Sequence, residues 1–250
     1  MYIDQTRPIV IERSLVNAGL PDPCAKCDAR GQSVCGAMDA TDLSRLADIA
    51  VVQSYDPGAT VVEEGDPAAY FYNITAGYAR LCKLLPDGRR QIMGFPTRGH
   101  FLGLAVTNAY GFSVEAITPL RLCRFSRAKL RAVISDFPQF EARLLETAVH
   151  ELVVAQGQML LLGRKTARER LASFLMNELV SQEACACPRN HVHLPMTRAD
   201  IADYLGLTIE TVSRSFSRLK TDRLIDLQGG AAEVSILDRR RLAAIGDGET

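Results

Sequence analysis

Hydrophobic and polar positions change their period along the chain. Between residues 50 and 127, short runs rich in Val, Ile, Phe and Tyr alternate with glycine-bearing turns about ten residues apart. The turns are Asp56-Pro57-Gly58, Glu64-Gly65-Asp66, Ala76-Gly77, Pro86-Asp87-Gly88 and Arg98-Gly99. This spacing is typical of a small all-β barrel or sandwich, and we expect a β-roll here.

A long helix is predicted from about Pro138 to about Leu162. Some of its apolar positions advance by three and four residues in turn, which is the heptad spacing of a helix that pairs with another helix. This seam comprises Leu145, Ala148, Leu152, Ala155, Met159 and Leu162. A second apolar stripe lies beside it at Val149, Val153 and Leu160. We expect one face to pack on its own domain and the other on a second copy; a helix buried in the core is the alternative.

The pattern after residue 163 predicts three helices and a short strand. The first helix spans 166–180 with Leu171, Phe174, Leu175 and Leu179 inward, a loop follows over 181–190, and His191 to Leu194 alternates like a strand.

Two further helices are joined by a glycine. Thr197 caps the first, with Asp200 at N3 and Ile201, Ala202 and Leu205 inward; Gly206 ends it. Thr208 caps the second, which extends to about Asp222 with Ile209, Val212, Phe216 and Leu219 inward. This is a helix-turn-helix, and Gly229-Gly230 followed by Glu233 to Leu237 predicts a β-hairpin wing.

The outward face of the second helix suits DNA recognition. Arg pairs with guanine, Glu accepts from cytosine, and Lys or hydroxyl groups hold phosphates or base edges. We expect DNA contacts from Thr197, Arg198, Thr208, Glu210, Thr211, Ser213, Arg214, Ser217, Arg218 and Lys220. A structural helical hairpin with a solvated charged face is the alternative.

Composition limits these interpretations. The 250 residues carry 29 basic and 29 acidic side chains, so nucleic-acid binding has to be local rather than global. A hydrophobic fraction of 47% suffices for one large domain or two modest ones. No apolar run approaches the ~18 residues of a membrane span, and the first residues lack the apolar core of a signal peptide. We expect a cytoplasmic protein with no membrane partner.

The stretch from Leu194 to Arg214 resembles the helix-turn-helix signature of the CRP/FNR family, the regulators named after the cyclic AMP receptor protein and the fumarate-nitrate reduction regulator. The order of β-roll, long helix and winged helix-turn-helix agrees along nearly the whole chain. The resemblance implies an α+β fold with an arm over 1–36, a β-roll sensor domain over 37–135, a dimerisation helix over 136–162 and a DNA-binding domain over 163–242.

The same resemblance implies a mode of action. A homodimer would bind a palindromic double-stranded site with half-sites like TTGAT, read by the family's E-x-x-S-R array at Glu210, Ser213 and Arg214. Surface loops would contact RNA polymerase. The family's cyclic-nucleotide branch uses an acid and an Arg-Ser or Arg-Thr pair for ribose and phosphate. Here Leu104 replaces the acid and Gly111-Phe112 precede Ser113, so we expect no cyclic nucleotide.

Seven cysteines point to metal or redox chemistry in a reducing compartment. The iron–sulfur branch of the family holds a [4Fe-4S] cluster with three N-terminal cysteines and one in the β-roll. The resemblance therefore implies ligands Cys24, Cys27, Cys35 and Cys123, although the seven-residue gap before Cys35 exceeds the five residues of the enteric type. Four thiolates also suit tetrahedral zinc, and a reduced, unliganded thiol set is a further alternative.

The other cysteines have weaker signals. We expect Cys82 to be a small packed residue. Cys185 and Cys187, with His191 and His193, have donor types that could bind zinc, but they lie in a loop and its adjoining strand.

The expected function is an oxygen-responsive transcription regulator, active with its cluster at low oxygen. The segment from Leu152 to Leu162 carries no charge that would oppose pairing, so we expect the dimer to persist in air more than in some relatives. A small-molecule binding module and a redox enzyme are the alternatives from other classes. No phosphate loop, glycine-rich cofactor motif or acid–base constellation supports an enzyme.

Overall fold

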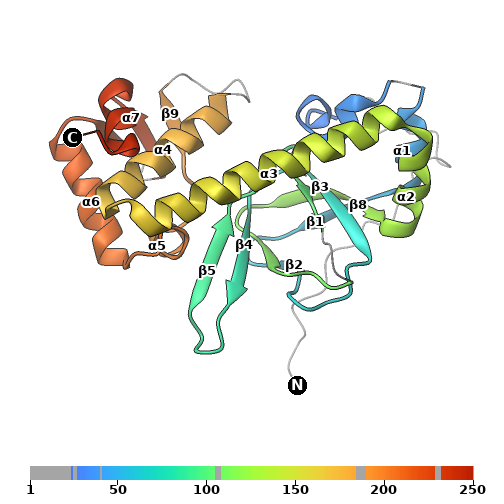
Figure 1. Cartoon of the computed structure of the whole chain (residues 1–250), viewed down its shortest axis with the longest axis horizontal. Helices are drawn as coiled ribbons and strands as arrows, with labels where there is room; N and C mark the ends of the chain where they lie inside the picture. Colours follow the sequence, from blue (N-terminus) through green and yellow to red (C-terminus); the bar gives the residue numbers. More distant parts are fainter. Residues whose placement is uncertain are drawn as a thin grey trace. The chain divides into compact units, whose positions relative to one another are not determined.

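A computed structural model describes residues 24, 27–39, 41–104, 108–183, 190–228 and 232–249 (Figure 1). The chain forms two compact units, residues 1–152 and 153–250. The division lies inside the long helix α3 (Pro138–Arg164), about ten residues before the expected domain boundary, because the last turns of α3 pack with the second unit.

The first unit contains the β-roll that the turn spacing predicts. Its strands are β1 (Ala50–Tyr55), β2 (Thr60–Val62), β3 (Tyr70–Ala76), β4 (Ala79–Leu84), β5 (Arg90–Gly94), β6 (Phe101–Leu102), β7 (Ser113–Ala116) and β8 (Leu120–Ser126). They form two antiparallel four-stranded sheets in the orders β1-β8-β3-β6 and β2-β7-β4-β5. At Gly77 φ is +91° and a Cβ would lie 2.3 Å from the Pro119 carbonyl oxygen, so this turn requires glycine.

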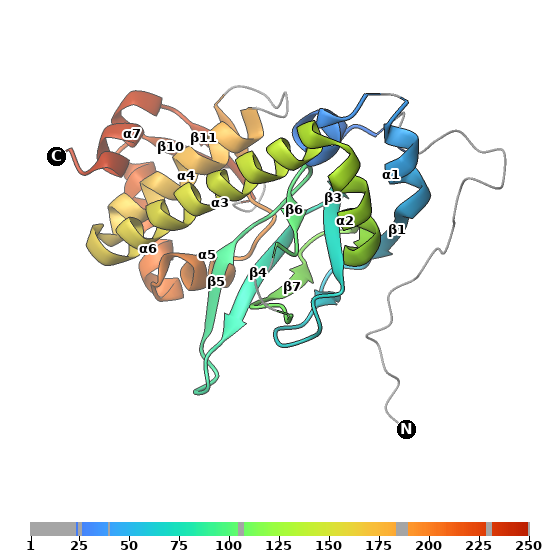
Figure 2. The same cartoon turned by 45° about the vertical axis from the view of Figure 1, so that its right-hand side comes forward.

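The described residues of the first unit form two apolar clusters. Ile74, Val114 and Leu122 belong to the one between the two sheets. The other covers the outer face of the β1-β8-β3-β6 sheet with residues of the 3₁₀ turn Val34–Ala37, of α1 (Leu43–Ile49), of α2 (Arg127–Asp136) and of the start of α3. A further 3₁₀ turn, Arg30–Gln32, has no buried residue. Figure 2 shows α1 and α2 alongside this sheet. Neither short helix was predicted, because each has fewer than three turns of apolar periodicity.

Helix α3 has the predicted extent, with two more residues at its C-terminal end. Its ends are buried through Phe140 in the first unit and Leu161 in the second. Its middle is not: the seam residues Leu145, Leu152 and Met159 are 66%, 58% and 73% exposed. The second stripe, Val149, Val153 and Leu160, is also more than half exposed. The expectation that one of the two faces packs on its own domain is therefore wrong for this stretch of the helix.

The second unit follows the predicted winged arrangement. Its elements are α4 (Ala167–Glu183), β9 (His191–His193), α5 (Arg198–Leu205), α6 (Ile209–Thr221), β10 (Ile225–Gln228), β11 (Glu233–Ile236) and α7 (Arg239–Asp247). Antiparallel strands in the order β10-β11-β9 confirm the wing, whose predicted turn at Gly229-Gly230 lies outside the described residues. Helix α4 buries the four predicted residues and extends three residues past Val180, into the expected loop.

Helix α7 was not anticipated. Asp238 is its N-cap, accepting a hydrogen bond from the Arg241 amide at 2.9 Å, and Leu242 is fully buried. None of the helices described combines the length and apolarity that crossing a bilayer requires.

Candidate functional site

Helix α5 begins at a complete capping box. The Thr197 hydroxyl accepts from the Asp200 amide at 3.1 Å and donates to Asp200 Oδ2 at 2.7 Å, while the Thr197 amide donates to the same oxygen at 3.0 Å. Gly206 ends the helix with φ +61°, and Leu207 donates back to the Ala202 carbonyl at 3.0 Å. These contacts fix the turn that leads into α6.

Helix α6 buries Val212, Phe216 and Leu219, as its periodicity predicts. Ile209 differs: it is 49% exposed, so its expected inward orientation is wrong. It occupies the first helical position at the edge of the buried stripe, where the turn separates α6 from α5. Thr208 caps the helix, accepting from the Thr211 amide at 3.3 Å.

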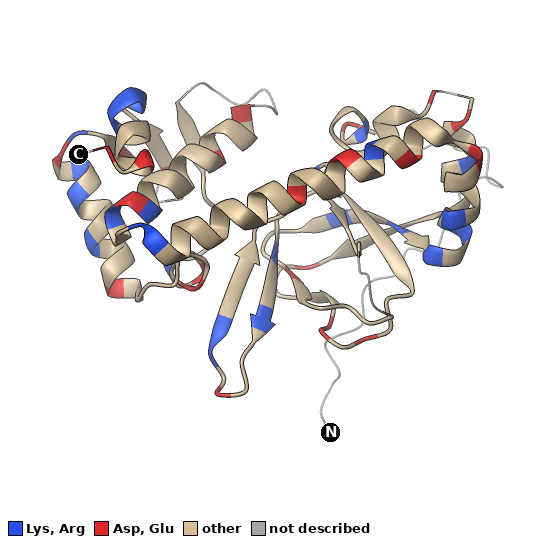
Figure 3. Ribbon diagram, in the orientation of Figure 1, with Lys and Arg blue, Asp and Glu red and all other residues tan. Residues whose placement is uncertain are grey.

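The outward face of α6 presents most of the predicted DNA-contacting residues together. Exposed side chains on it are Glu210, Ser213, Arg214, Ser217, Arg218 and Lys220. Arg214 donates to the Thr211 hydroxyl at 3.3 Å. Hydrogen bonds from its own backbone amide and from Thr208 hold the pKa of Glu210 below its usual range, which keeps this carboxylate charged. Figure 3 shows basic residues along this helix.

Arg198 has a different environment from the rest of the predicted set. Its guanidinium carbon lies 3.2 Å from the centre of the Phe216 ring, and burial lowers its pKa to about 10. The side chain therefore stacks against the core between α5 and α6. Sequence reasoning could not find this contact, because arginine at a helix start suits both DNA binding and stacking on the core.

Two other arginines of the unit, Arg168 and Arg170, also have internal partners. Arg168 pairs with Asp222, just after α6, at 2.5 Å. Arg170 donates to the carbonyls of Leu162 and Leu205 at 2.8 and 2.7 Å, which ties the end of α3 to the end of α5. Arg168 and Arg170 therefore have contacts within the unit, whereas Arg214, Arg218 and Lys220 are exposed on α6.

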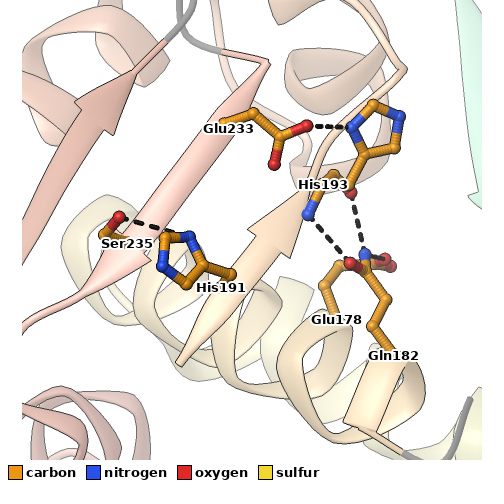
Figure 4. A network of polar contacts seen from close by, with 6 residues as sticks. All are labelled: Glu178, Gln182, His191, His193, Glu233 and Ser235. Atoms are coloured by element: carbon orange, nitrogen blue, oxygen red, sulfur yellow. Dashed lines mark hydrogen bonds and ion pairs between the residues drawn. The ribbon is translucent and has the colours of Figure 1, made fainter. Parts of the chain in front are cut away.

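A polar network joins α4 to the wing (Figure 4). The Gln182 side chain accepts from the His193 amide and donates to the His193 carbonyl, both at 2.8 Å. His193 Nδ1 lies 2.6 Å from Glu233 Oε1, and His191 contacts Ser235 at 3.4 Å. Burial raises the pKa of Glu178, which accepts from Gln182 at 3.4 Å, to about 7. Both histidines have partners within the wing; Cys185 and Cys187, the other candidate zinc donors, lie outside the described residues.

Candidate cysteines from the N-terminal segment and the β-roll converge on one side of the first sheet. Cys24, Cys35 and Cys123 pack against the apolar cluster there. Burial raises the pKa of the Cys35 thiol to about 11 and that of Cys123 to about 12. The nearby Cys27 thiol raises both values further, and Cys35 also raises that of Cys123. Cys27, Cys35 and Cys123 are therefore electrostatic neighbours.

The described thiols are all free rather than in disulfides, and within the described ranges no three His, Cys, Asp or Glu side chains are arranged to hold a metal ion. Asn73 Nδ2 donates to Cys35 Sγ at 4.0 Å, and the Cys35 amide donates to the Ser33 hydroxyl at 3.3 Å. Cys82 is buried on β4, away from this set, as a packed residue is expected to be.

The positions that bear on cyclic nucleotides lie elsewhere in the roll. Leu104 is 40% exposed, and the Ser113 hydroxyl accepts from the Glu64 amide at 3.0 Å. Part of the segment between them, residues 105–107, lies outside the described ranges. The expected absence of cyclic nucleotide binding stays a prediction.

Comparison with known proteins gives a consistent match. The Crp-like helix-turn-helix domain matches residues 169–245, and the cyclic nucleotide-binding domain matches residues 52–137. The nitrogen fixation regulation protein FixK of Bradyrhizobium diazoefficiens is 41% identical over 222 residues, which cover 89% of this chain and 93% of that protein. The transcriptional activator protein FnrL of Cereibacter sphaeroides is 37% identical over 225 residues, covering 88% and 90%.

Among solved structures, FixK2 from Bradyrhizobium japonicum superposes with a TM-score of 0.73 at 36% identity, covering 79% of this chain and 97% of that one. The α+β architecture expected from the sequence is thereby confirmed. These relatives are regulators rather than enzymes, and the matches span both units. The chain therefore belongs to the CRP/FNR family of DNA-binding transcription regulators.

Proposed function

We propose that this regulator responds to oxygen through a [4Fe-4S] cluster held by Cys24, Cys27, Cys35 and Cys123. The observation that carries the proposal is the convergence of thiols from the N-terminal segment and β8 on one buried face. With its cluster, a homodimer binds palindromic DNA with TTGAT-type half-sites at low oxygen and controls genes of anaerobic or microaerobic growth.

The donor set fits the cluster. Sulfur donors in an apolar setting are the ligands that iron–sulfur clusters take from proteins. Burial keeps the thiols of Cys35 and Cys123 protonated. The positive charges of Arg30 near Cys35 and of Arg121 near Cys123 act in the other direction and favour the thiolate form that ligates a metal. The cluster would supply an oxygen-labile link between the N-terminal segment and β8. Cys35 sits in the turn Val34–Ala37 and Cys123 in a central strand, so the link joins a short loop segment to the sheet.

The exposed seam of α3 supports the dimer. Leu145, Leu152 and Met159 present an unpaired apolar row, and such a row at heptad spacing is typical of helix pairing. A two-fold pair of chains would place two α6 helices about one turn of DNA apart, as a palindrome requires. Contact with RNA polymerase through surface loops belongs to the same proposal and rests on family membership.

A second candidate is the same DNA-binding regulator responding to another signal, with thiols that are structural or bind zinc. The version with structural thiols is favoured by the finding that no three potential ligands in the described ranges are arranged around a metal position. Both candidates share the DNA-binding unit and differ in what the cysteines hold.

Oxygen dependence of DNA affinity separates the two candidates. Protein purified without oxygen would be titrated onto a labelled TTGAT-type palindrome by fluorescence anisotropy, before and after exposure to air. We expect the affinity to fall at least tenfold in air, and Cys123→Ala to bind weakly under both conditions. Equal affinities for the wild type in both conditions would favour the second candidate.

A further inference from the structure

Asn73 is a polar side chain on an apolar face. It lies on β3 and is 1% exposed. In the antiparallel register it faces Cys123 on β8 and Phe101 on β6. Since directly opposed residues of antiparallel strands project to the same face, Asn73 shares the face of Cys123. Phe71 and Phe125 form an opposed pair on this face too.

The two polar ends of the Asn73 amide have unequal environments. Nδ2 donates to Cys35 Sγ at 4.0 Å, while Oδ1 is buried with no hydrogen-bond partner in the described part of the chain. A buried, unsatisfied amide oxygen lowers stability. An apolar residue of similar volume would fill this position without that cost, so packing alone does not account for an amide between two cysteines.

The amide is useful to a charged sulfur. Hydrogen bonds to ionised acceptors are stronger than those to neutral ones, so an N–H group beside Cys35 favours the thiolate over the thiol. We propose that Asn73 is a positioning residue of the thiol set: its amide holds the Cys35 sulfur beside Cys123 and stabilises that sulfur when it ligates a metal. This inference rests on the proposed ligand role of the four cysteines.

Cobalt(II) binding tests the inference without requiring an assembled cluster. Reduced, metal-free, full-length protein would be titrated with Co(II) under anaerobic conditions, following thiolate-to-cobalt absorption. Asn73→Leu removes the amide and keeps the branched side chain with the same number of heavy atoms. Loss of a side chain that orients a ligand typically weakens metal affinity about 10–100-fold, and we expect that range here. The melting temperature of Asn73→Leu should equal or exceed that of the wild type, because the variant lacks the buried, unsatisfied Oδ1.

Gln53→Leu is the matched control. Gln53 is an equally buried amide of the same sheet, but it accepts from the Tyr55 hydroxyl at 3.2 Å and lies opposite Leu122, one position along from Cys123. Its side chain therefore projects to the other face, and Co(II) affinity should change less than twofold. Asn73→Ser has a smaller side chain that cannot overpack, and it should also weaken Co(II) binding. It therefore provides the test if Asn73→Leu does not fold.

The outcomes are separable. If the wild type binds Co(II) and both Asn73 variants bind it equally well, or if Gln53→Leu weakens it as much, the role of Asn73 is overturned and the proposed function stands. If the wild type itself gives no thiolate–cobalt absorption, the ligand role of the cysteines fails and the inference fails with it. Weaker binding by the Asn73 variants alone, without loss of melting temperature, supports the inference.

Discussion

Residues with DNA-binding chemistry have two different uses in the second unit. Thr197 caps α5 and Arg198 stacks on Phe216, whereas Glu210, Ser213 and Arg214 remain exposed on α6. All five were candidates by residue type. The sequence was sufficient to select these candidates. It was not sufficient to identify the contacts of Thr197 and Arg198, because these depend on local hydrogen bonds and on how α5 and α6 pack, which helical periodicity does not specify.

Arg214→Ala should weaken binding to the palindrome about 5–150-fold, since one bidentate arginine–guanine pair contributes about 1–3 kcal/mol. Affinity for unrelated DNA should fall much less. Arg240→Ala is the control, because Arg240 is an exposed arginine on α7 rather than on α6. Fluorescence anisotropy on both DNAs measures the effect. Equal losses from the two variants would remove Arg214 from the recognition set.

Thr197→Ala should destabilise the second unit by about 1 kcal/mol, the usual value of an N-cap, and lower its melting temperature by about 4–8 °C. The change removes the hydroxyl that bonds Asp200, whose side chain is 2% exposed. Thr221→Ala, at the exposed end of α6, should have little effect. Thermal unfolding followed by circular dichroism tests this, and an unchanged transition for Thr197→Ala would show that the capping box adds no stability.

Glu178 should make stability depend on pH. Burial raises its folded-state pKa from 4.5 to about 7, so the folded protein binds more protons than the unfolded chain between these values. Stability contributed by this group therefore falls as pH rises from about 4.5 to 7 and stays low above it. We expect Glu178→Gln to be more stable than the wild type at pH 8, by about 1–3 kcal/mol, and similar to it near pH 4.5. Urea unfolding at several pH values gives the comparison, and parallel pH profiles would refute it.

At the scale of elements, the long helix shows what periodicity can and cannot give. The spacing of its apolar residues predicted its bounds and its heptad seam. The spacing could not predict which stripe is buried, because a row of apolar residues has the same pattern whether it packs on its own domain or on another chain. In the single chain both stripes are exposed, so neither packs on its own domain over this stretch.

Leu152→Glu should dissociate the dimer without unfolding the chain, because Leu152 is already 58% exposed in the single chain. A charge on each copy of the seam would face its symmetry mate, and the dissociation constant should rise at least tenfold. Val154→Glu is the matched control, since Val154 is 48% exposed but belongs to neither stripe. Light scattering coupled to size exclusion measures the oligomeric state of both variants. A dimer that survives Leu152→Glu would show that the seam is not the dimer interface.

The uncharged segment from 152 to 162 leads to a further expectation. Protein without its cluster should remain largely dimeric, since no acidic side chain in this segment opposes pairing. Size exclusion of the apo-protein at micromolar concentration tests the point. A clean monomer would show that pairing requires the cluster.

At the scale of the whole molecule, the order of elements could be predicted because local patterns specify it: glycine turns for the roll, heptads for α3, and caps around α5 and α6. The meeting of the cysteines could not be derived from spacing. Cys35 and Cys123 are separated by most of the β-roll, and only the pairing of β3 with β8, together with the turn at Val34–Ala37 packed on the sheet, brings them together. The expectation that these cysteines lie together came from the family resemblance.

The central claim is that these four cysteines hold an oxygen-labile iron–sulfur cluster. Anaerobically purified wild type, Cys123→Ser and Cys82→Ser would be assayed for iron and acid-labile sulfide, with visible spectra before and after air. The account predicts about four irons and four sulfides per chain in the wild type and in Cys82→Ser, bleaching in air, and loss of both in Cys123→Ser. Zinc, or no metal, in a wild type that still binds its palindrome in air would contradict it.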